Sequence, residues 1–308
     1  MQSFRRILFL FCLLLSCTTF CGPATALAAG ILFSLLIGNP FALESAVWSK
    51  RLLQLSVVGL GFGVSISDVW HAGREAVFYT PVSIIATVAI GVLLGRMIRT
   101  PVKASILISF GTAICGGSAI AAMAPVINAK DEEIAVSLAT IFSLNAVALM
   151  IFPLLGNFFG LTEREFGLWA ALAIHDTSSV VGAASAYGAT ALAVGTTVKL
   201  ARAVWIAPAA LIVSRFTQTK AKTGIPLFII GFILAASIRS FAPNLTQAWN
   251  LLAFISRQGL VVTLFLVGNG LTLAVLRRVG IRPLGQGLIL WILVSASVLT
   301  AILAGLVR

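Results

Sequence analysis

Charge is scarce in this sequence. Only 10% of the 308 residues are Asp, Glu, Lys or Arg, whereas 59% are hydrophobic, and the mean hydropathy is +1.08. Soluble domains carry about 25% charged residues, because their surface must face water. The composition therefore excludes a water-soluble protein and predicts an all-α polytopic membrane protein.

The sequence also lacks the signals of several functional classes. No Walker motif or nucleotide-binding domain is present, which excludes ATP-driven pumping by this chain alone. The basic residues give a net charge of +12 but are spread singly and in pairs, so no nucleic-acid partner is expected. The cysteines lack metal-ligand spacing and are expected to be small buried side chains, so neither a metal nor a cofactor is predicted. They are Cys12, Cys17, Cys21 and Cys115.

Apolar segments long enough to span a bilayer, about 20 residues each, recur along the whole chain. Almost nothing remains between them, so residues 1–308 are expected to form a single transmembrane domain. Eleven segments are predicted, at roughly 5–22, 24–40, 51–67, 77–97, 104–128, 132–156, 166–188, 190–214, 225–241, 250–275 and 284–307.

The distribution of basic residues predicts a bacterial inner-membrane protein with a cytoplasmic amino terminus and an outside carboxyl terminus. Fourteen fall on the cytoplasmic side: Arg5, Arg6, Lys50, Arg51, Arg96, Arg99, Lys103, Arg164, Arg215, Lys220, Lys222, Arg277, Arg278 and Arg282. Five fall on the other side: Arg74, Lys130, Arg239, Arg257 and Arg308.

The first 22 residues have two interpretations. They form the first helix, or, with Arg5 and Arg6 before an apolar core and an Ala-rich stretch, they resemble a signal peptide. A retained helix is preferred, and cleavage would leave ten spans in the same orientation.

Two glycine motifs indicate an inverted repeat, which is a common architecture of secondary transporters. "LGFGVSI" at 60–66 and "VGNGLTL" at 267–273 share one pattern, 207 residues apart, on spans predicted to run in opposite directions. Gly59 and Gly63 also form a small-xxx-small pair, so simple helix packing is an equal alternative.

The fifth span contains a predicted interruption at Cys115-Gly116-Gly117-Ser118. Paired glycines loosen a helix, and Ser can cap a new one. A half-helix beginning at Ser118 would present a positive end that binds anions. The alternative is a kinked packing helix without a ligand.

The seventh span contains a second predicted interruption, near Asp176 in His175-Asp176-Thr177-Ser178-Ser179. Two interruptions in one bundle indicate a shared midplane site. Asp176 is expected to bind a proton or cation and His175 to titrate near neutral pH. Alternatively, Asp176 only caps a half-helix and His175 bonds a carbonyl.

The eighth span carries Lys199 and Arg202, whose i, i+3 spacing places them on one helix face. They are expected to face the interior, paired with Asp176 or available for an anion. Asn145 and Asn269 are further candidate buried polar groups that cap, bridge helices or touch a ligand.

Together these motifs resemble a known family. "CGGSAIAAMAPVI" from Cys115, "KDEEIAVSLATIFSLNAVALMIFP" from Lys130, and "HDTSSVVGAA" with "VKLARAVWIAP" from His175 onward are similar to the YeiH family of bacterial inner-membrane proteins, described as sulfate exporters. The similarity covers roughly residues 25–308. It implies the inverted-repeat, crossed-broken-helix fold of the sodium/proton antiporter and bile-acid symporter superfamily, with Gly116, Gly117 and Ser118 at one crossover and His175–Ser179, Lys199 and Arg202 as the other cluster.

The two interrupted spans are only about 60 residues apart and run in the same direction in the eleven-span prediction. A simple pair of inverted five-helix repeats would separate and oppose them. Either one segment is re-entrant, or the glycine motifs are the crossed pair.

The function predicted first is a secondary transporter of a small anion, such as sulfate or sulfite, coupled to H⁺ or Na⁺, with the bilayer and the anion as partners and a homodimer left open. A cation/proton antiporter centred on Asp176 is the alternative. An intramembrane enzyme using His175 with Ser178 or Ser179 is a remote third, so no enzymatic activity is expected.

Overall fold

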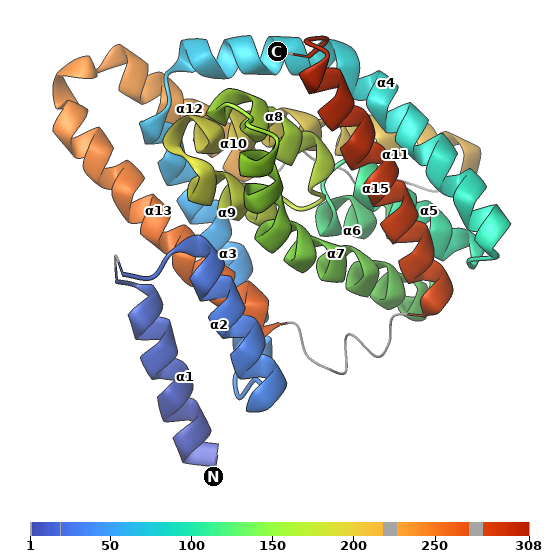
Figure 1. Ribbon diagram of the computed structural model, residues 1–308, viewed down its shortest axis with the longest axis horizontal. Helices are drawn as coiled ribbons and strands as arrows, with labels where there is room; N and C mark the ends of the chain where they lie inside the picture. The colour runs from blue at the N-terminus through green and yellow to red at the C-terminus, as the bar shows by residue number, and fades with distance from the viewer. Residues whose placement is uncertain (1, 19, 218–226, 271–279, 308) are drawn as a thin grey trace.

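The computed structural model describes residues 2–18, 20–217, 227–270 and 280–307, and within these ranges it contains helices and no strand (Figure 1). Lys220, Lys222, Arg277, Arg278, Arg308 and the end of the second glycine motif, residues 271–273, lie outside them. The α-helices are α1 (Gln2–Ser16), α2 (Pro23–Leu36), α3 (Ala42–Leu60), α4 (Ile66–Ile98), α5 (Val102–Ala113), α6 (Gly117–Val126), α7 (Asp131–Phe158), α8 (Glu163–Ala173), α9 (Thr177–Tyr187), α10 (Ala189–Val204), α11 (Ile206–Thr217), α12 (Leu227–Phe241), α13 (Thr246–Asn269) and α15 (Ile281–Leu303).

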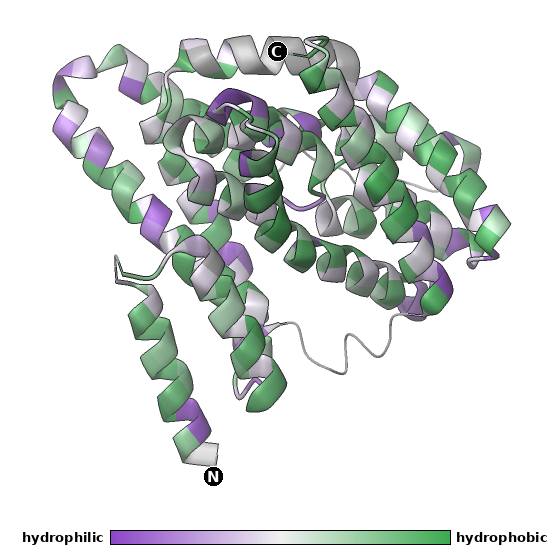
Figure 2. Cartoon of the chain, viewed as in Figure 1, coloured by the Kyte–Doolittle hydropathy of each residue, from purple (hydrophilic) through white to green (hydrophobic). Residues whose placement is uncertain are grey.

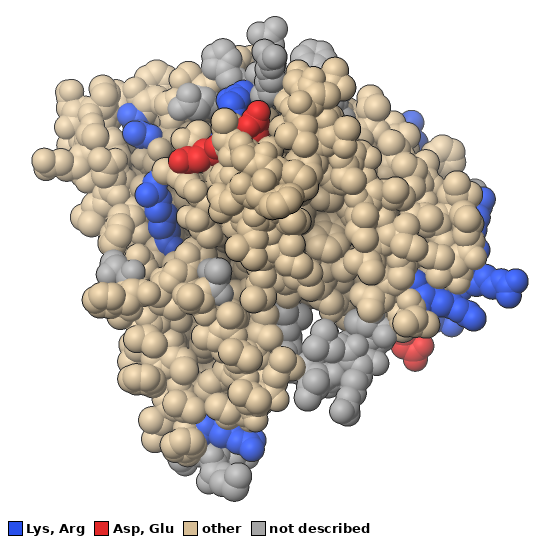
Figure 3. All heavy atoms as spheres, in the orientation of Figure 1, with Lys and Arg blue, Asp and Glu red and all other residues tan. Residues whose placement is uncertain are grey.

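The apolar residues lie on the outside as well as in the core (Figure 2). Among the described residues, five helices are long and apolar enough to cross a membrane, and less than half of the most apolar 18-residue stretch of each is buried inside the protein. Most of the face shown in Figure 3 is correspondingly uncharged, and the Lys, Arg, Asp and Glu side chains appear on it as scattered small groups. Exposed apolar surface on this scale faces lipid, so the chain is an all-α polytopic membrane protein.

One group of helices packs through small residues. Gly59 on α3 faces Ser256 on α13, and Gly259 on α13 faces Ser56 on α3, so the two helices run antiparallel. Gly63, in the 3₁₀ helix η1 (Gly61–Gly63) that follows α3, lies against the same helix. The packing interpretation of the first glycine motif is therefore confirmed.

Helix α1 packs on this group through Phe9, which is 3% exposed. Its ring centroid lies 5.7 Å from that of Phe33 and 5.2 Å and 5.5 Å from those of Phe41 and Phe265. Cleavage of the first helix would thus expose an aromatic cluster.

We expect Gly30→Ala to destabilise the contact between α2 and α13. A Cβ at Gly30 would lie 2.2 Å from the Phe265 carbonyl oxygen, a backbone atom that cannot move aside alone. Overpacking of this kind costs about 1–3 kcal/mol, measurable as a lower melting temperature in detergent. Gly285→Ala, where nothing lies within 4 Å, is the control and should melt no lower than the wild type. Equal melting of both variants would contradict the packing.

The fifth apolar segment does not cross the bundle but turns back. Helices α5 and α6 are separated by residues 114–116, and they pack against one another. Lys103 Nζ, at the start of α5, donates to the carbonyl of Asn128, just past the end of α6, at 2.6 Å. The segment is therefore a helical hairpin that begins and ends at the same face.

The seventh segment is a second hairpin. The hydroxyl of Tyr187, at the end of α9, donates to the carbonyl of Leu161, before the start of α8, at 2.6 Å. Its ring stacks on Phe166 at 3.8 Å, and Glu163 Oε2 accepts from the N–H of Thr190 at 2.7 Å. The predicted crossing of segments 104–128 and 166–188 is wrong because apolarity alone does not separate a crossing from a return.

The long helix α7 connects the two hairpins, so they enter from opposite faces. In a background without the native cysteines, Glu132→Cys should react with an impermeant maleimide from the same face as Val102→Cys. Phe159→Cys and Thr190→Cys should both react from the opposite face. Labelling of Glu132→Cys and Val102→Cys from different faces would contradict the first hairpin and show that segment 104–128 crosses the membrane.

Candidate functional site

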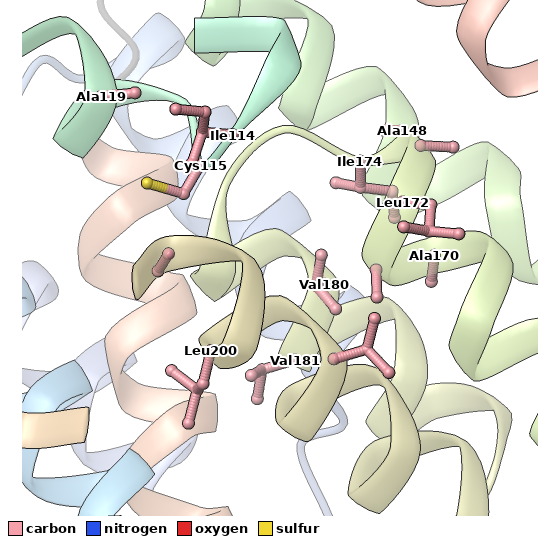
Figure 4. Packing of buried hydrophobic residues seen from close by; sticks show 14 of the residues in the cluster. Ile114, Cys115, Ala119, Ala148, Ala170, Leu172, Ile174, Val180, Val181 and Leu200 are labelled. Carbon is pink, nitrogen blue, oxygen red and sulfur yellow. The ribbon is translucent and has the colours of Figure 1, made fainter. Parts of the chain in front are cut away.

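The tips of the two hairpins meet inside the protein. Gly116 has a φ of +61°, and a Cβ built on it would lie 3.4 Å from both Cα and Cβ of Asp176. The four arms have 10 to 12 residues each, or roughly 15–18 Å of helix, about half the hydrocarbon thickness. The two tips therefore meet near the centre of the bilayer, where Ile114 and Ile174 lie in the apolar cluster beside α10 (Figure 4).

Asp176 begins α9 as its N-cap. The carboxylate Oδ2 accepts from the backbone N–H of Ser178 at 3.1 Å and also from the Ser178 hydroxyl. Thr177, Ser178 and Ser179 form the first turn and are buried. The predicted interruption near Asp176 and its capping role are confirmed.

Asn145 on α7 holds the same tip. Its Oδ1 accepts from the backbone N–H groups of His175 at 3.2 Å and Asp176 at 3.4 Å, and lies 3.2 Å from His175 Nδ1. Because an amide oxygen only accepts, Nδ1 carries a hydrogen in this arrangement. His175 thus bonds a carbonyl oxygen, that of a side-chain amide, as the structural alternative predicts.

The carboxyl end of α8 stops within the protein, where its last carbonyls have no intrahelical donors and lipid offers none. Lys199 Nζ donates to the carbonyls of Ala171 at 3.3 Å and Ile174 at 2.7 Å. The indole N–H of Trp291, on α15, donates to the carbonyl of Ala173 at 3.1 Å. Side chains of two other helices therefore replace the missing helical donors.

Arg202 joins the two hairpins. Its Nε donates to the carbonyl of Ala113, at the end of α5, at 2.7 Å, and its Nη1 to the carbonyl of Leu172, near the end of α8, at 2.8 Å. Helix carboxyl ends carry partial negative charge, which a cation stabilises. The predicted inward orientation is confirmed, because Arg202 is 1% and Lys199 0% exposed. Their recorded hydrogen bonds, however, go to backbone carbonyls and not to Asp176.

Three polar atoms of this site lack a hydrogen-bond partner among the described residues: Arg202 Nη2, Asn145 Nδ2 and His175 Nε2. Roughly 90% or more of buried polar groups are bonded in folded proteins, so such atoms require an explanation. Two donors and one ring nitrogen at a single site are consistent with groups that a ligand or a proton satisfies.

Two further predicted site residues have different outcomes. Helix α6 begins at Gly117 with Gly116 as its N-cap, so the prediction that Ser118 caps it is wrong, and Ser118 is exposed. Asn269, at the end of α13, is buried as expected, and its side-chain Oδ1 and Nδ2 have no hydrogen-bond partner among the described residues. Its backbone carbonyl accepts from Asn39 Nδ2 at 3.1 Å, and its backbone N–H lies near Gly30. Its backbone thus lies at the contact between α2 and α13.

The sequence contains a further repeat that the glycine motifs obscured. The units 102–158 and 163–217 each consist of a hairpin followed by a spanning helix or helix pair, and they enter from opposite faces. The identical residues are Ala113-Ile114 and Ser118 with Ala173-Ile174 and Ser178, 60 positions apart, and Ala146-Val147 with Ala203-Val204, 57 positions apart. The second pair aligns Asn145 with Arg202. Trp291, by contrast, has no sequence signal as a site residue.

Comparison with known proteins identifies the family. The family model described as conserved hypothetical protein 698 matches residues 4–287. A UPF0324 membrane protein of Geobacter sulfurreducens is 53% identical over 98% of this chain and 97% of its own, and one of Bdellovibrio bacteriovorus is 46% identical over 97% and 94%. No solved structure matches the chain. With identities this high over nearly the whole length, the chain belongs to the conserved hypothetical protein 698 (UPF0324) family, which is the YeiH family of membrane proteins.

Proposed function

We propose that this protein is a secondary transporter that carries a small anion, of the class of sulfate or sulfite, across the bacterial inner membrane, coupled to H⁺ or Na⁺. The observation that carries the proposal is the pair of opposed helical hairpins whose tips meet at Gly116 and Asp176. Broken helices with ends near the midplane are the common substrate site of secondary transporters.

The charges at the tips favour an anion. Two helix carboxyl ends and two amino ends, each with about half a charge, cancel one another. The formal charges of Lys199, Arg202 and Asp176 then leave one positive charge. The unpartnered Arg202 Nη2 and Asn145 Nδ2 are donors and suit an oxyanion.

The alternative of a cation/proton antiporter has one observation in its favour. Asp176 is the only one of the nine acidic residues in the two tips, and its recorded bonds use Oδ2 alone. The remote enzymatic hypothesis has less support, since the recorded bond of the Ser178 hydroxyl goes to Asp176 and that of the His175 ring to Asn145.

Orientation is part of the proposal. The α5–α6 hairpin places Lys130 on the side of Lys103, and the α8–α9 hairpin places Arg164 on the other side. The two changes cancel, and with Arg257 inside α13 the basic residues stand at fourteen to four in favour of a cytoplasmic amino terminus.

The test is flux in proteoliposomes that contain the full chain. Labelled sulfate and sulfite are supplied separately, each with and without an imposed pH or Na⁺ gradient. We expect one anion to move in the wild type and to follow one gradient. Na⁺ or H⁺ flux without movement of either anion would replace this proposal with the cation antiporter.

A further inference from the structure

A pocket lies between α10, which follows the second hairpin, and the group formed by α3, η1, α12 and α13. Leu60, Val64, Leu192 and Phe232 supply apolar walls, and Thr196 and Arg257 are its polar members. The pocket begins at Ala189, the first residue of α10, and reaches Thr196 two turns further along the helix. It therefore extends inward from the face where the second hairpin begins.

Arg257 is the unusual residue of this pocket, because its side chain is exposed although it lies at the middle of an apolar helix. It is the twelfth of the 24 residues of α13, so either end of the helix is roughly 17 Å away, beyond the reach of an arginine side chain. No hydrogen bond or ion pair is recorded for it within the described part of the chain. A cation inside a span is costly and usually marks a pathway or a binding site.

Thr196 provides a second, independent observation. It is 1% exposed, and its Oγ1 has no hydrogen-bond partner among the described residues. In the same bundle, the hydroxyls of Thr140 and Thr263 donate to the carbonyl four residues earlier, whereas those of Thr80, Thr100 and Thr112 are also unpartnered within the described ranges. The Thr196 hydroxyl makes no such bond, although its residue lines the pocket.

The pocket is adjacent to the hairpin site. Thr196 precedes Lys199 by three residues on α10, which places it on the same helix face and roughly 4.5 Å away along the axis. An anion held by Arg257 and Thr196 is thus one helical turn from the cation that holds the end of α8.

We propose that this pocket is a second anion subsite, a station between the face where the second hairpin begins and the Lys199–Arg202 centre. The inference rests on the proposed function. The guanidinium of Arg257 and the hydroxyl of Thr196 donate to an oxyanion. The pocket volume is about 30 Å³, enough for a water-sized group, so binding of a sulfur oxyanion requires the pocket to widen.

The test measures how sulfate and sulfite flux in proteoliposomes depends on anion concentration, and compares the wild type with variants of the pocket. Thr196→Val removes an unbonded hydroxyl and keeps the shape, so we expect an unchanged melting temperature and a half-saturation concentration several-fold higher. Arg257→Gln should raise that concentration about tenfold or more, and Arg257→Lys should recover part of the loss. Arg215→Gln, exposed on α11, is the matched control and should behave as wild type.

The outcomes separate the two proposals. Wild-type half-saturation in both Thr196→Val and Arg257→Gln overturns the subsite and leaves the transporter standing. Absence of sulfate and sulfite flux in the wild type overturns both.

A labelling experiment tests the subsite without flux. In a background without native cysteines, Thr196→Cys should react with a sulfonate-bearing thiosulfonate, and the transported anion should slow the reaction. Val194→Cys, whose side chain faces Gly167 on α8, is the control that the anion should not protect. Failure of the anionic reagent to reach Thr196→Cys, or failure of the anion to slow it, overturns the subsite.

Discussion

Arg202→Ala is expected to be the most destabilising single substitution in the site. The Arg202 guanidinium donates to Ala113 on one hairpin and Leu172 on the other, and both acceptors lie at helix ends that water does not reach. Hydrogen bonds from a charged group contribute about 1.5–3 kcal/mol each, so loss of both costs about 3–6 kcal/mol. The melting temperature in detergent should fall by about 10 °C, or the protein should fail to accumulate in the membrane.

Two variants give this prediction its controls. Arg202→Lys keeps the charge but presents a single ammonium in place of the planar fork, so we expect an intermediate melting temperature. Arg215→Ala removes an exposed arginine from the end of α11 and should melt as the wild type does. If Arg202→Ala melted at the wild-type temperature, the two carbonyl contacts would not hold the hairpins together.

Asp176→Asn is expected to have the largest effect on transport with little effect on folding. Asn is as good an N-cap as Asp, so α9 should still begin at the same residue. The variant loses the only carboxylate at the hairpin tips. If that charge carries the coupling ion through a contact worth about 1.5–3 kcal/mol, gradient-driven flux falls about tenfold to a hundredfold.

Asp176→Ala separates the two roles of this residue. It removes both the charge and the cap. Flux should therefore fall as in Asp176→Asn, while the free energy of unfolding should fall by about 1 kcal/mol more than in that variant. Flux of labelled sulfate or sulfite and melting in detergent, measured on the same preparations, distinguish the variants. Wild-type coupled flux in Asp176→Asn would reduce Asp176 to a structural cap.

The interruptions were predictable because they depend on local chemistry. Gly116 occupies a backbone conformation that other residues disfavour, and Asp176 caps the helix that follows it. Their sequence neighbourhoods therefore carry the signal. The inward face of Lys199 and Arg202 was predictable for a similar reason, since their spacing fixes a shared side of α10.

The hairpins were not predictable from hydropathy, because a segment of about 25 apolar residues has the same composition whether it crosses or returns. The contacts that decide, Lys103 with Asn128 and Tyr187 with Leu161, join residues about 25 positions apart and exist only in the folded chain. The backbone acceptors of Arg202 were hidden likewise, since they become its neighbours only after the second hairpin folds back.

The bond from Arg202 to both hairpins has a consequence for motion. Arg202 ties the ends of α5 and α8 to α10, and Trp291 ties α8 to α15. Parting the tips would break these bonds in a medium that cannot replace them. In a rocking or sliding movement, the two hairpins and α10 would instead move together as one rigid body. The surface along which this body slides would then be the contact of α9 with α2 and α13. Access would then alternate by displacement of that body, with the tips closed throughout.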